Sequence, residues 1–266
     1  MDQPVGLLGA ALRRDRWITL GGMAALAAMA WVALARMAAG MGGAAMGAMG
    51  GAGMAMPSTA PWGAAELVAL AGMWAVMMVA MMVPAAAPMV LVFAATMRRR
   101  AARGEPAVAT WVFLLGYLLV WTGFSVAAGT AQWALHAGAL VSPATMRATP
   151  LLAAALLVAA GVFQWTPLKH ACLSHCRSPL HFWMSGWREG AAGALEMGVR
   201  HGTWCVGCCW LLMALLFVAG VMNLAWVAAL GLFVLAERAL PGGAMLGRAA
   251  GVVLIGWGLW LALAAR

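Results

Sequence analysis

Long apolar runs alternate with short polar segments along the chain, and this pattern predicts its fold. Several runs exceed the roughly 18 residues that a helix needs to cross a bilayer. A transmembrane β-barrel would require strands with alternating polar positions, which the sequence lacks. We therefore predict an all-α, polytopic transmembrane helical bundle of about seven spans, at approximately residues 17–39, 62–96, 108–135, 151–166, 204–220, 222–236 and 249–264.

Two features interrupt this regular pattern. Pro84 and Pro88 fall inside the second apolar run and predict a kink or a break there. The segment "GMGGAAMGAMGGAGMAMPS" (40–58) has no amphipathic period, which predicts a flexible loop. We accordingly divide the chain into residues 1–60, a first span with a Gly/Met-rich outer loop, and residues 61–266, a membrane domain. Within that domain we expect a Cys/His-rich cytoplasmic segment at residues 167–209.

Composition and charge support a membrane protein and suggest its orientation. Hydrophobic residues make up 65% of the chain and charged residues 9%, whereas soluble domains are about one quarter charged. Thirteen of the sixteen basic residues lie in the head, at 98–103, at 169–200 and at 238–248. Because cytoplasmic loops carry an excess of Lys and Arg, we predict an N-in, C-out protein of a bacterial cytoplasmic (inner) membrane. Its partner is then the lipid bilayer, and the net charge of +9 does not indicate nucleic-acid binding.

Cysteine and histidine residues cluster in one short part of the sequence. All five cysteines and four of the five histidines lie within residues 170–209. If residues 197–213 form one helix, spacings of three and four place His201 and three cysteines on one face. Folding the segment "KHACLSHCRSPLHFW" (169–183) over that face would bring thiols from both sides together. The candidate metal ligands are Cys172, Cys176, Cys205, Cys208, Cys209, His201, His170 and His175.

These ligand types are compatible with more than one chemistry. Thiolates and thioethers in low coordination suit Cu(I), and we favour metal handling or transfer with copper as the ion. Four thiolates would suit Zn(II), as a structural site in a membrane scaffold or assembly subunit. Cys205-x-x-Cys208 also has the spacing of a thiol–disulfide oxidoreductase. Each cysteine taken alone is compatible with ordinary apolar packing.

Methionines form a second sulfur-rich pattern. The second apolar run carries Met73, Met77 and Met81 one turn apart, with Met78 and Met82 beside them. Thioethers along one helix face could form a pathway for Cu(I), and they are equally compatible with helix packing. The outer loop adds Met41, Met46, Met49, Met54 and Met56.

The sequence gives no sign of nucleotide chemistry or of a familiar catalytic set. It has no P-loop, no GxGxxG after a strand and no defensible Ser-His-Asp pattern. We therefore expect no catalytic residues and no nucleotide or nucleic-acid partner. A protein partner or a metallochaperone is compatible with the sequence.

Three long motifs resemble a known bacterial family. They are "MWAVMMVAMMVPAAAPM" (73–89), "QWTPLKHACLSHCRSPL" (164–180) and "HGTWCVGCCWLLMALLFVAGVMNLAW" (201–226). Over roughly residues 62–240 the chain resembles the predicted metal-binding integral membrane proteins, domain of unknown function 2182. The resemblance implies a helical membrane protein with a metal site at the motif cysteines, His201 and the Pro/Met segment.

Overall fold

Every predicted apolar run is helical in the computed structural model, which describes residues 4–50, 63–142, 145–177 and 187–265. Across these ranges there is no strand, and the one isolated β-bridge joins Val141 to Ala148. The helices are α1 (Pro4–Gly50), α2 (Ala64–Ala102), α3 (Thr110–Ala137), α4 (Pro150–Phe163), α5 (Pro167–Arg177), α7 (Gly190–Ala214), α8 (Leu216–Ala219), α9 (Leu224–Ala239) and α10 (Gly243–Ala264).

The helices are long and apolar enough for a polytopic membrane protein. Within the described ranges, five helices could cross a membrane, and a sixth span results if α4 and α5, bent by 66°, count as one. The 16-residue α9 is shorter than the ~18 residues of a span. The helical membrane bundle is thus confirmed, whereas the count of seven spans and the N-in orientation stay predictions.

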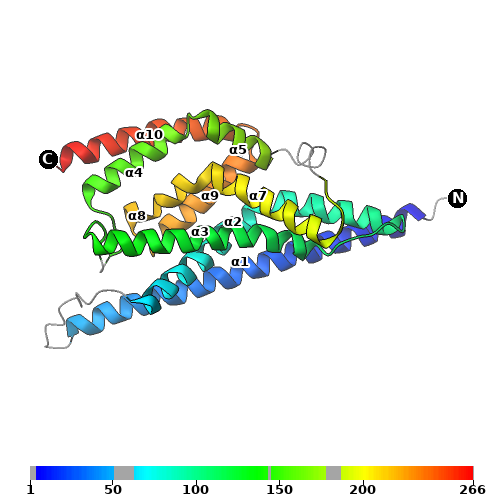
Figure 1. Ribbon diagram of the computed structural model, residues 1–266, viewed down its shortest axis with the longest axis horizontal. Helices are drawn as coiled ribbons and strands as arrows, with labels where there is room; N and C mark the ends of the chain where they lie inside the picture. Colours follow the sequence, from blue (N-terminus) through cyan, green and yellow to red (C-terminus); the bar gives the residue numbers. More distant parts are fainter. Residues whose placement is uncertain (1–3, 51–62, 143–144, 178–186, 266) are drawn as a thin grey trace.

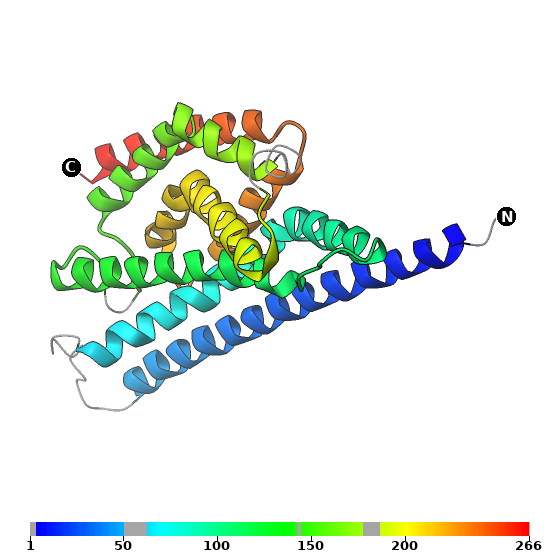
Figure 2. The same cartoon turned by 45° about the vertical axis from the view of Figure 1, so that its right-hand side comes forward.

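The first two helices differ in detail from the sequence-based expectations. α1 extends to Gly50, so residues 40–50 are helical and not the loop that we predicted. Alanine and methionine are good helix formers, and they offset the cost of about 1 kcal/mol for each glycine. Pro84 and Pro88 lie inside a single α2 helix, which bends along its length and is not broken (Figures 1 and 2). A bend there is expected because proline removes a backbone hydrogen bond.

The helices form two groups with α7 and α9 between them. On one side α1, α2 and α3 pack side by side, and on the other α4 packs along α10 (Figure 1). α7 contacts α3 on one face and α5 on another. This central position of α7 places its side chains between the two groups.

Glycines allow α3 and α7 to approach closely. A Cβ atom added to Gly198 would overlap the carbonyl of Phe113, and one added to Gly116 would overlap the carbonyl of Leu195. Small residues of this kind let membrane helices pack backbone to backbone. The approach brings the middle of α7 against the aromatic face of α3.

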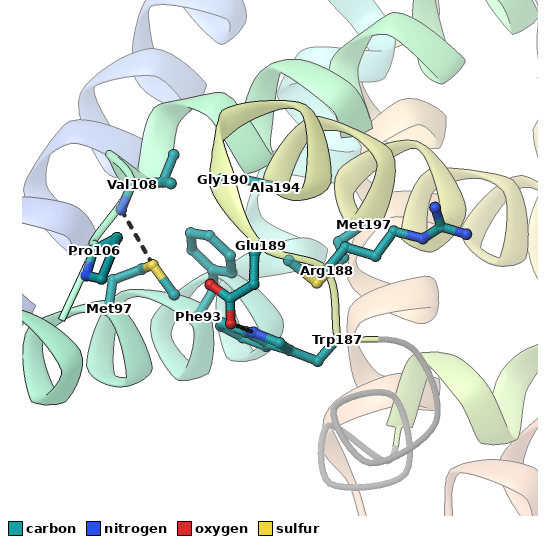
Figure 3. Close-up of a pocket in the computed structure, with 10 residues that line it drawn as sticks. All are labelled: Phe93, Met97, Pro106, Val108, Trp187, Arg188, Glu189, Gly190, Ala194 and Met197. Carbon is teal, nitrogen blue, oxygen red and sulfur yellow. Dashed lines mark hydrogen bonds between the residues drawn. The ribbon is translucent and has the colours of Figure 1, made fainter.

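The start of α7 is fixed by polar contacts just before Gly190. The Glu189 carboxylate accepts hydrogen bonds from both terminal nitrogens of Arg100 (2.9 and 2.8 Å) and from Trp187 Nε1 (2.8 Å). Figure 3 shows Trp187 and Glu189 beside a cavity of about 10 Å³, which is room for about one water molecule. Residues 190–203 therefore continue the cysteine-bearing helix and do not lie apart from it.

Candidate functional site

Three buried cysteines of α7 form the centre of the site. Cys205, Cys208 and Cys209 are at most 1% exposed. The thiols of Cys208 and Cys209 each donate to the carbonyl oxygen of Cys205, at 3.1 and 3.0 Å. These contacts span three and four residues along the helix, so the predicted common face exists.

α5 brings two further thiols against this face. The Cys172 sulfur packs on Gly207, where an added Cβ would lie 2.8 Å from it. The thiol of Cys176 lies beside the thiol of Cys208. α5 and α7 therefore meet through their cysteines, and we refer to Cys172, Cys176, Cys205, Cys208 and Cys209 as the thiol cluster.

Tyr117 of α3 connects the thiol cluster to the methionine-rich α2. Its hydroxyl lies 3.0 Å from the Cys205 sulfur and donates to the carbonyl oxygen of Met82 at 3.1 Å. The side chain is completely buried. One phenol thus joins three helices at the edge of the cluster.

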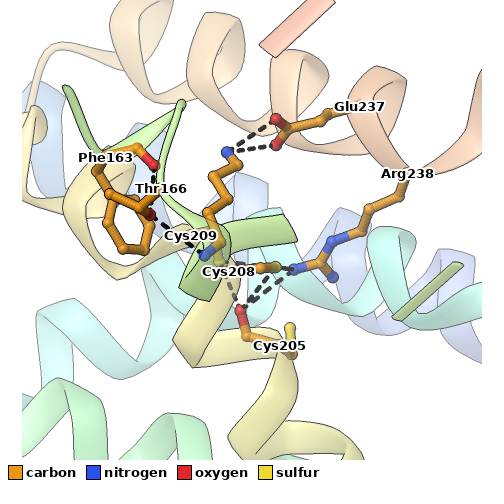
Figure 4. Close-up of polar contacts among 8 residues, drawn as sticks. Phe163, Thr166, Cys205, Cys208, Cys209, Glu237 and Arg238 are labelled. Atoms are coloured by element: carbon orange, nitrogen blue, oxygen red, sulfur yellow. Dashed lines mark hydrogen bonds and ion pairs between the residues drawn. The ribbon is translucent and has the colours of Figure 1, made fainter. Parts of the chain in front are cut away.

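Arg238 of α9 enters the cluster from the opposite side. Its Nη2 atom lies 3.2 Å from the Cys208 sulfur, 3.5 Å from the Cys209 sulfur and 3.4 Å from the Cys205 carbonyl oxygen. Figure 4 shows the guanidinium directed at the cysteines. A permanent positive charge is thereby buried against three sulfur-bearing residues.

A second buried cation lies close to Arg238 but has its own anionic partner. Lys169 Nζ contacts both carboxylate oxygens of Glu237, at 2.8 and 2.9 Å. Lys169 and Glu237 are each 1% exposed. In Figure 4 the Glu237 carboxylate lies apart from the cysteines. The pair neutralises itself and leaves Arg238 as the net charge beside the thiols.

The candidate histidines are held mainly by aromatic packing. His201 is 2% exposed and stacks against Phe113 and Tyr117, with ring centroids 6.0 and 5.6 Å apart. His175 stacks on Trp204 at 4.2 Å. His170 is partly buried on α5. His201 thus lies one helical turn from Cys205, and His175 contributes to the packing of α5 on α7.

The predicted methionine ladder is buried along α2. Met73, Met77, Met78, Met81 and Met82 are all at most 8% exposed. Met81 also lines a cavity of about 260 Å³ between α1, α2 and α9. Of the expected outer-loop methionines, Met41, Met46 and Met49 fall on α1 at positions whose side chains are not described, and Met54 and Met56 lie outside the described residues.

The cluster is not arranged as a finished metal site. Among the residues that the structure describes, no group of three or more His, Cys, Asp or Glu side chains has the arrangement needed to hold a metal ion. Arg238 offers a physical reason, because its guanidinium lies against the sulfurs that would have to converge. Binding of an ion to these thiols would require local rearrangement.

Sequence reasoning missed four residues of this site. Tyr117 was not considered, and Lys169, Glu237 and Arg238 were assigned to polar connections. Lys169 and Arg238 are buried, so eleven, not thirteen, of the sixteen basic residues remain as possible loop charges. The available signals were that the chain has a single tyrosine and a single lysine, and that "ER" follows directly on an apolar run.

The two acidic residues before the cysteine face serve as ion-pair partners. Glu189 binds Arg100, and Glu196 binds Arg188 at 3.0 Å. The observed contacts are salt bridges at exposed positions.

The fold and the thiol cluster together define a polytopic helical membrane protein with buried soft ligands. A family model described as the PpoB2 copper chaperone family matches residues 71–261, and the chain belongs to this copper chaperone family. The family is thus copper-related, but it is not the one that we named from the motifs. No curated protein and no solved structure matches the chain.

Proposed function

We propose that this protein is a membrane-embedded chaperone that holds Cu(I) on its thiol cluster and passes the ion to a protein partner. The ligands come from Cys176, Cys205, Cys208 and Cys209, with Cys172 next to them. This proposal assigns to particular residues the copper handling that membership of the family suggests.

The observation that carries the proposal is the meeting of α5 and α7 at their cysteines, where the Cys172 sulfur packs on Gly207 and Cys176 lies beside Cys208. This contact brings together thiols from two helices that are separate in sequence, and Cys172 and Cys208 are at most 3% exposed. Soft sulfur ligands in low coordination suit Cu(I) better than harder divalent ions. A centre shared by two helices can also open when the helices separate, which a carrier needs in order to release its cargo.

The methionines of α2 provide a possible route to the cluster. Met77 and Met81 lie one turn apart and are buried, and the Tyr117 hydroxyl lies between the backbone carbonyl of Met82 and the Cys205 sulfur. Neutral thioethers bind Cu(I) more weakly than thiolates do, so an ion would move from the ladder to the cluster. We propose that copper moves in this direction in this protein, from the methionines of α2 to the thiol cluster.

Metal analysis of the protein purified in detergent under reducing conditions tests the proposal. We expect about one copper per chain after loading with Cu(I). The triple variant C205S/C208S/C209S should lose it. The matched control is C172S, because the Cys172 sulfur packs on Gly207 and should be dispensable for most of the copper.

Other results would overturn the proposal in favour of a named alternative. Stoichiometric zinc in place of copper, together with a lower melting temperature after chelation, would indicate a structural zinc site. A protein that binds no metal but forms a reversible disulfide would indicate thiol–disulfide exchange. Burial argues against exchange, because Cys205 and Cys208 are at most 1% exposed and a partner thiol would have to reach them.

A further inference from the structure

Arg238 is a buried cation without a carboxylate partner. No ion pair among the described residues joins it to Asp or Glu, and its adjacent residue Glu237 binds Lys169 instead. Its Nη2 contacts are two thiol sulfurs and one carbonyl oxygen. The Nε and Nη1 atoms have no hydrogen-bond partner in the described part of the chain.

Burial of the Arg238 guanidinium is unfavourable in free energy unless a negative charge lies nearby. Desolvation of an ion costs several kcal/mol even after relaxation, and an apolar residue of similar volume is often the more stable choice. A thiolate is the only kind of negative charge that the contact atoms of Arg238 could supply, and binding of a metal ion displaces the thiol proton and so produces one. Negative charge on the thiol cluster would therefore stabilise the buried guanidinium of Arg238.

Counting charges identifies the centre that fits. Lys169 and Glu237 cancel, which leaves one positive charge on Arg238. Cu(I) with two thiolates carries one negative charge and is balanced. Zn(II) with three thiolates is balanced in the same way, whereas Cu(I) with three thiolates or Zn(II) with four carries two negative charges, and half of that would remain unbalanced in a low-dielectric site. For copper, the balanced centre is therefore the one with two thiolates.

We infer that Arg238 is the counter-cation of a Cu(I) centre with two thiolate ligands. Cys208 is one of the two ligands, because its sulfur is the one nearest to the Arg238 guanidinium. This inference rests on the proposed function and adds the number of thiolate ligands and a residue that balances their charge. Arg238 acts through the thiolates as a positioning residue and does not bind the metal.

Charge-matched and neutral variants of the full-length protein in detergent test the inference. Affinity for Cu(I) is measured by competition with a chromophoric Cu(I) chelator, and affinity for Zn(II) by a parallel competition. Removal of an outer-shell partner typically lowers metal affinity by about 10–100-fold, and we expect this loss for Cu(I) in Arg238→Met and Arg238→Gln. Arg238→Lys should recover most of it, because lysine restores the positive charge.

Controls separate this role from a structural one and from the proposed function. Arg248→Met removes an arginine that stacks on Trp165 and should leave both affinities unchanged. X-ray absorption of the copper-loaded wild type should show two sulfur ligands. Equal Cu(I) affinities in wild type and Arg238→Gln, or three sulfurs in the spectrum, would overturn the inference alone. Failure of the wild type to bind Cu(I) would instead overturn the proposed function.

Discussion

Two sulfur-rich regions of this protein, the methionine ladder of α2 and the thiol cluster of α5 and α7, are both largely buried but differ in their surroundings. Met77 and Met82 are fully buried in the apolar core. Cys208, by contrast, contacts a guanidinium and a thiol from another helix. Sulfur atoms thus lie in an apolar setting in α2 and in a polar, charged setting in the thiol cluster.

The difference follows from the charge that each ligand carries when it binds a metal. A thioether remains neutral, so a methionine can serve a passing ion without any compensating group and also fill an apolar core. A thiolate is an anion, and an anion in a dry interior needs a partner. The contrast predicts that the two regions respond differently to substitution.

The largest expected effect is on copper affinity at the thiol cluster. Cys208→Ser should lower Cu(I) affinity by at least about tenfold, the lower limit seen when metal sites lose supporting groups, because Cys208 joins three parts of the cluster. Met77→Leu should leave affinity nearly unchanged, since Leu and Met have similar volumes. Competition with a Cu(I) chelator measures both. A larger loss in Met77→Leu than in Cys208→Ser would place the principal site on α2.

The next effect concerns the packing that keeps the cluster together. Gly207→Val would place a side chain where the Cys172 sulfur lies, 2.8 Å from the new Cβ, and overpacking of this kind typically costs about 1–3 kcal/mol. We expect α5 to shift from α7, with a lower melting temperature and weaker copper binding. Gly256→Val makes the same change where nothing lies within 4 Å of a Cβ. Equal melting temperatures for the two variants would contradict the close packing of α5 on α7.

Local sequence patterns predicted the helices and the cysteine face well. Spacings of three and four residues placed Cys205, Cys208 and Cys209 together because an α-helix imposes that geometry on any sequence. The folding of α5 over α7 was also anticipated, since two cysteine pairs close in sequence have few other ways to share a site. The cysteine face depends on local periodicity alone, whereas the contact of α5 with α7 followed from the clustering of the cysteines in one short part of the sequence.

The charged part of the site could not be predicted in the same way. Arg238 reaches the cysteines only because α9 packs near α7, and Lys169 finds Glu237 across 68 positions of sequence. Basic residues at the ends of apolar runs indicate loops in most membrane proteins, and this rule misassigned both. Tyr117 likewise meets Cys205 only through the close approach of α3 and α7 at glycines.

The smallest expected effect concerns the ion pair that joins the end of the methionine helix to the start of the cysteine helix. The hydrogen bond from Trp187 and the Arg100 guanidinium lower the pKa of the exposed Glu189 carboxyl below its usual value. A lowered pKa in the folded state stabilises the protein above the unfolded pKa of about 4.3, and this stabilisation disappears as the pH falls through the folded-state pKa.

Glu189→Gln should therefore lower the melting temperature slightly near pH 7, and this effect should shrink as the pH falls through the folded-state pKa and also in high salt. Glu196→Gln is the matched control, because Glu196 binds Arg188 within the same segment and does not connect α7 to α2. Thermal unfolding in detergent across this pH range measures both variants. A difference for Glu189→Gln that does not shrink as the pH falls would mean that the carboxylate does not tie the two helices together. Helix packing alone would then hold the methionine ladder and the thiol cluster in their relative positions.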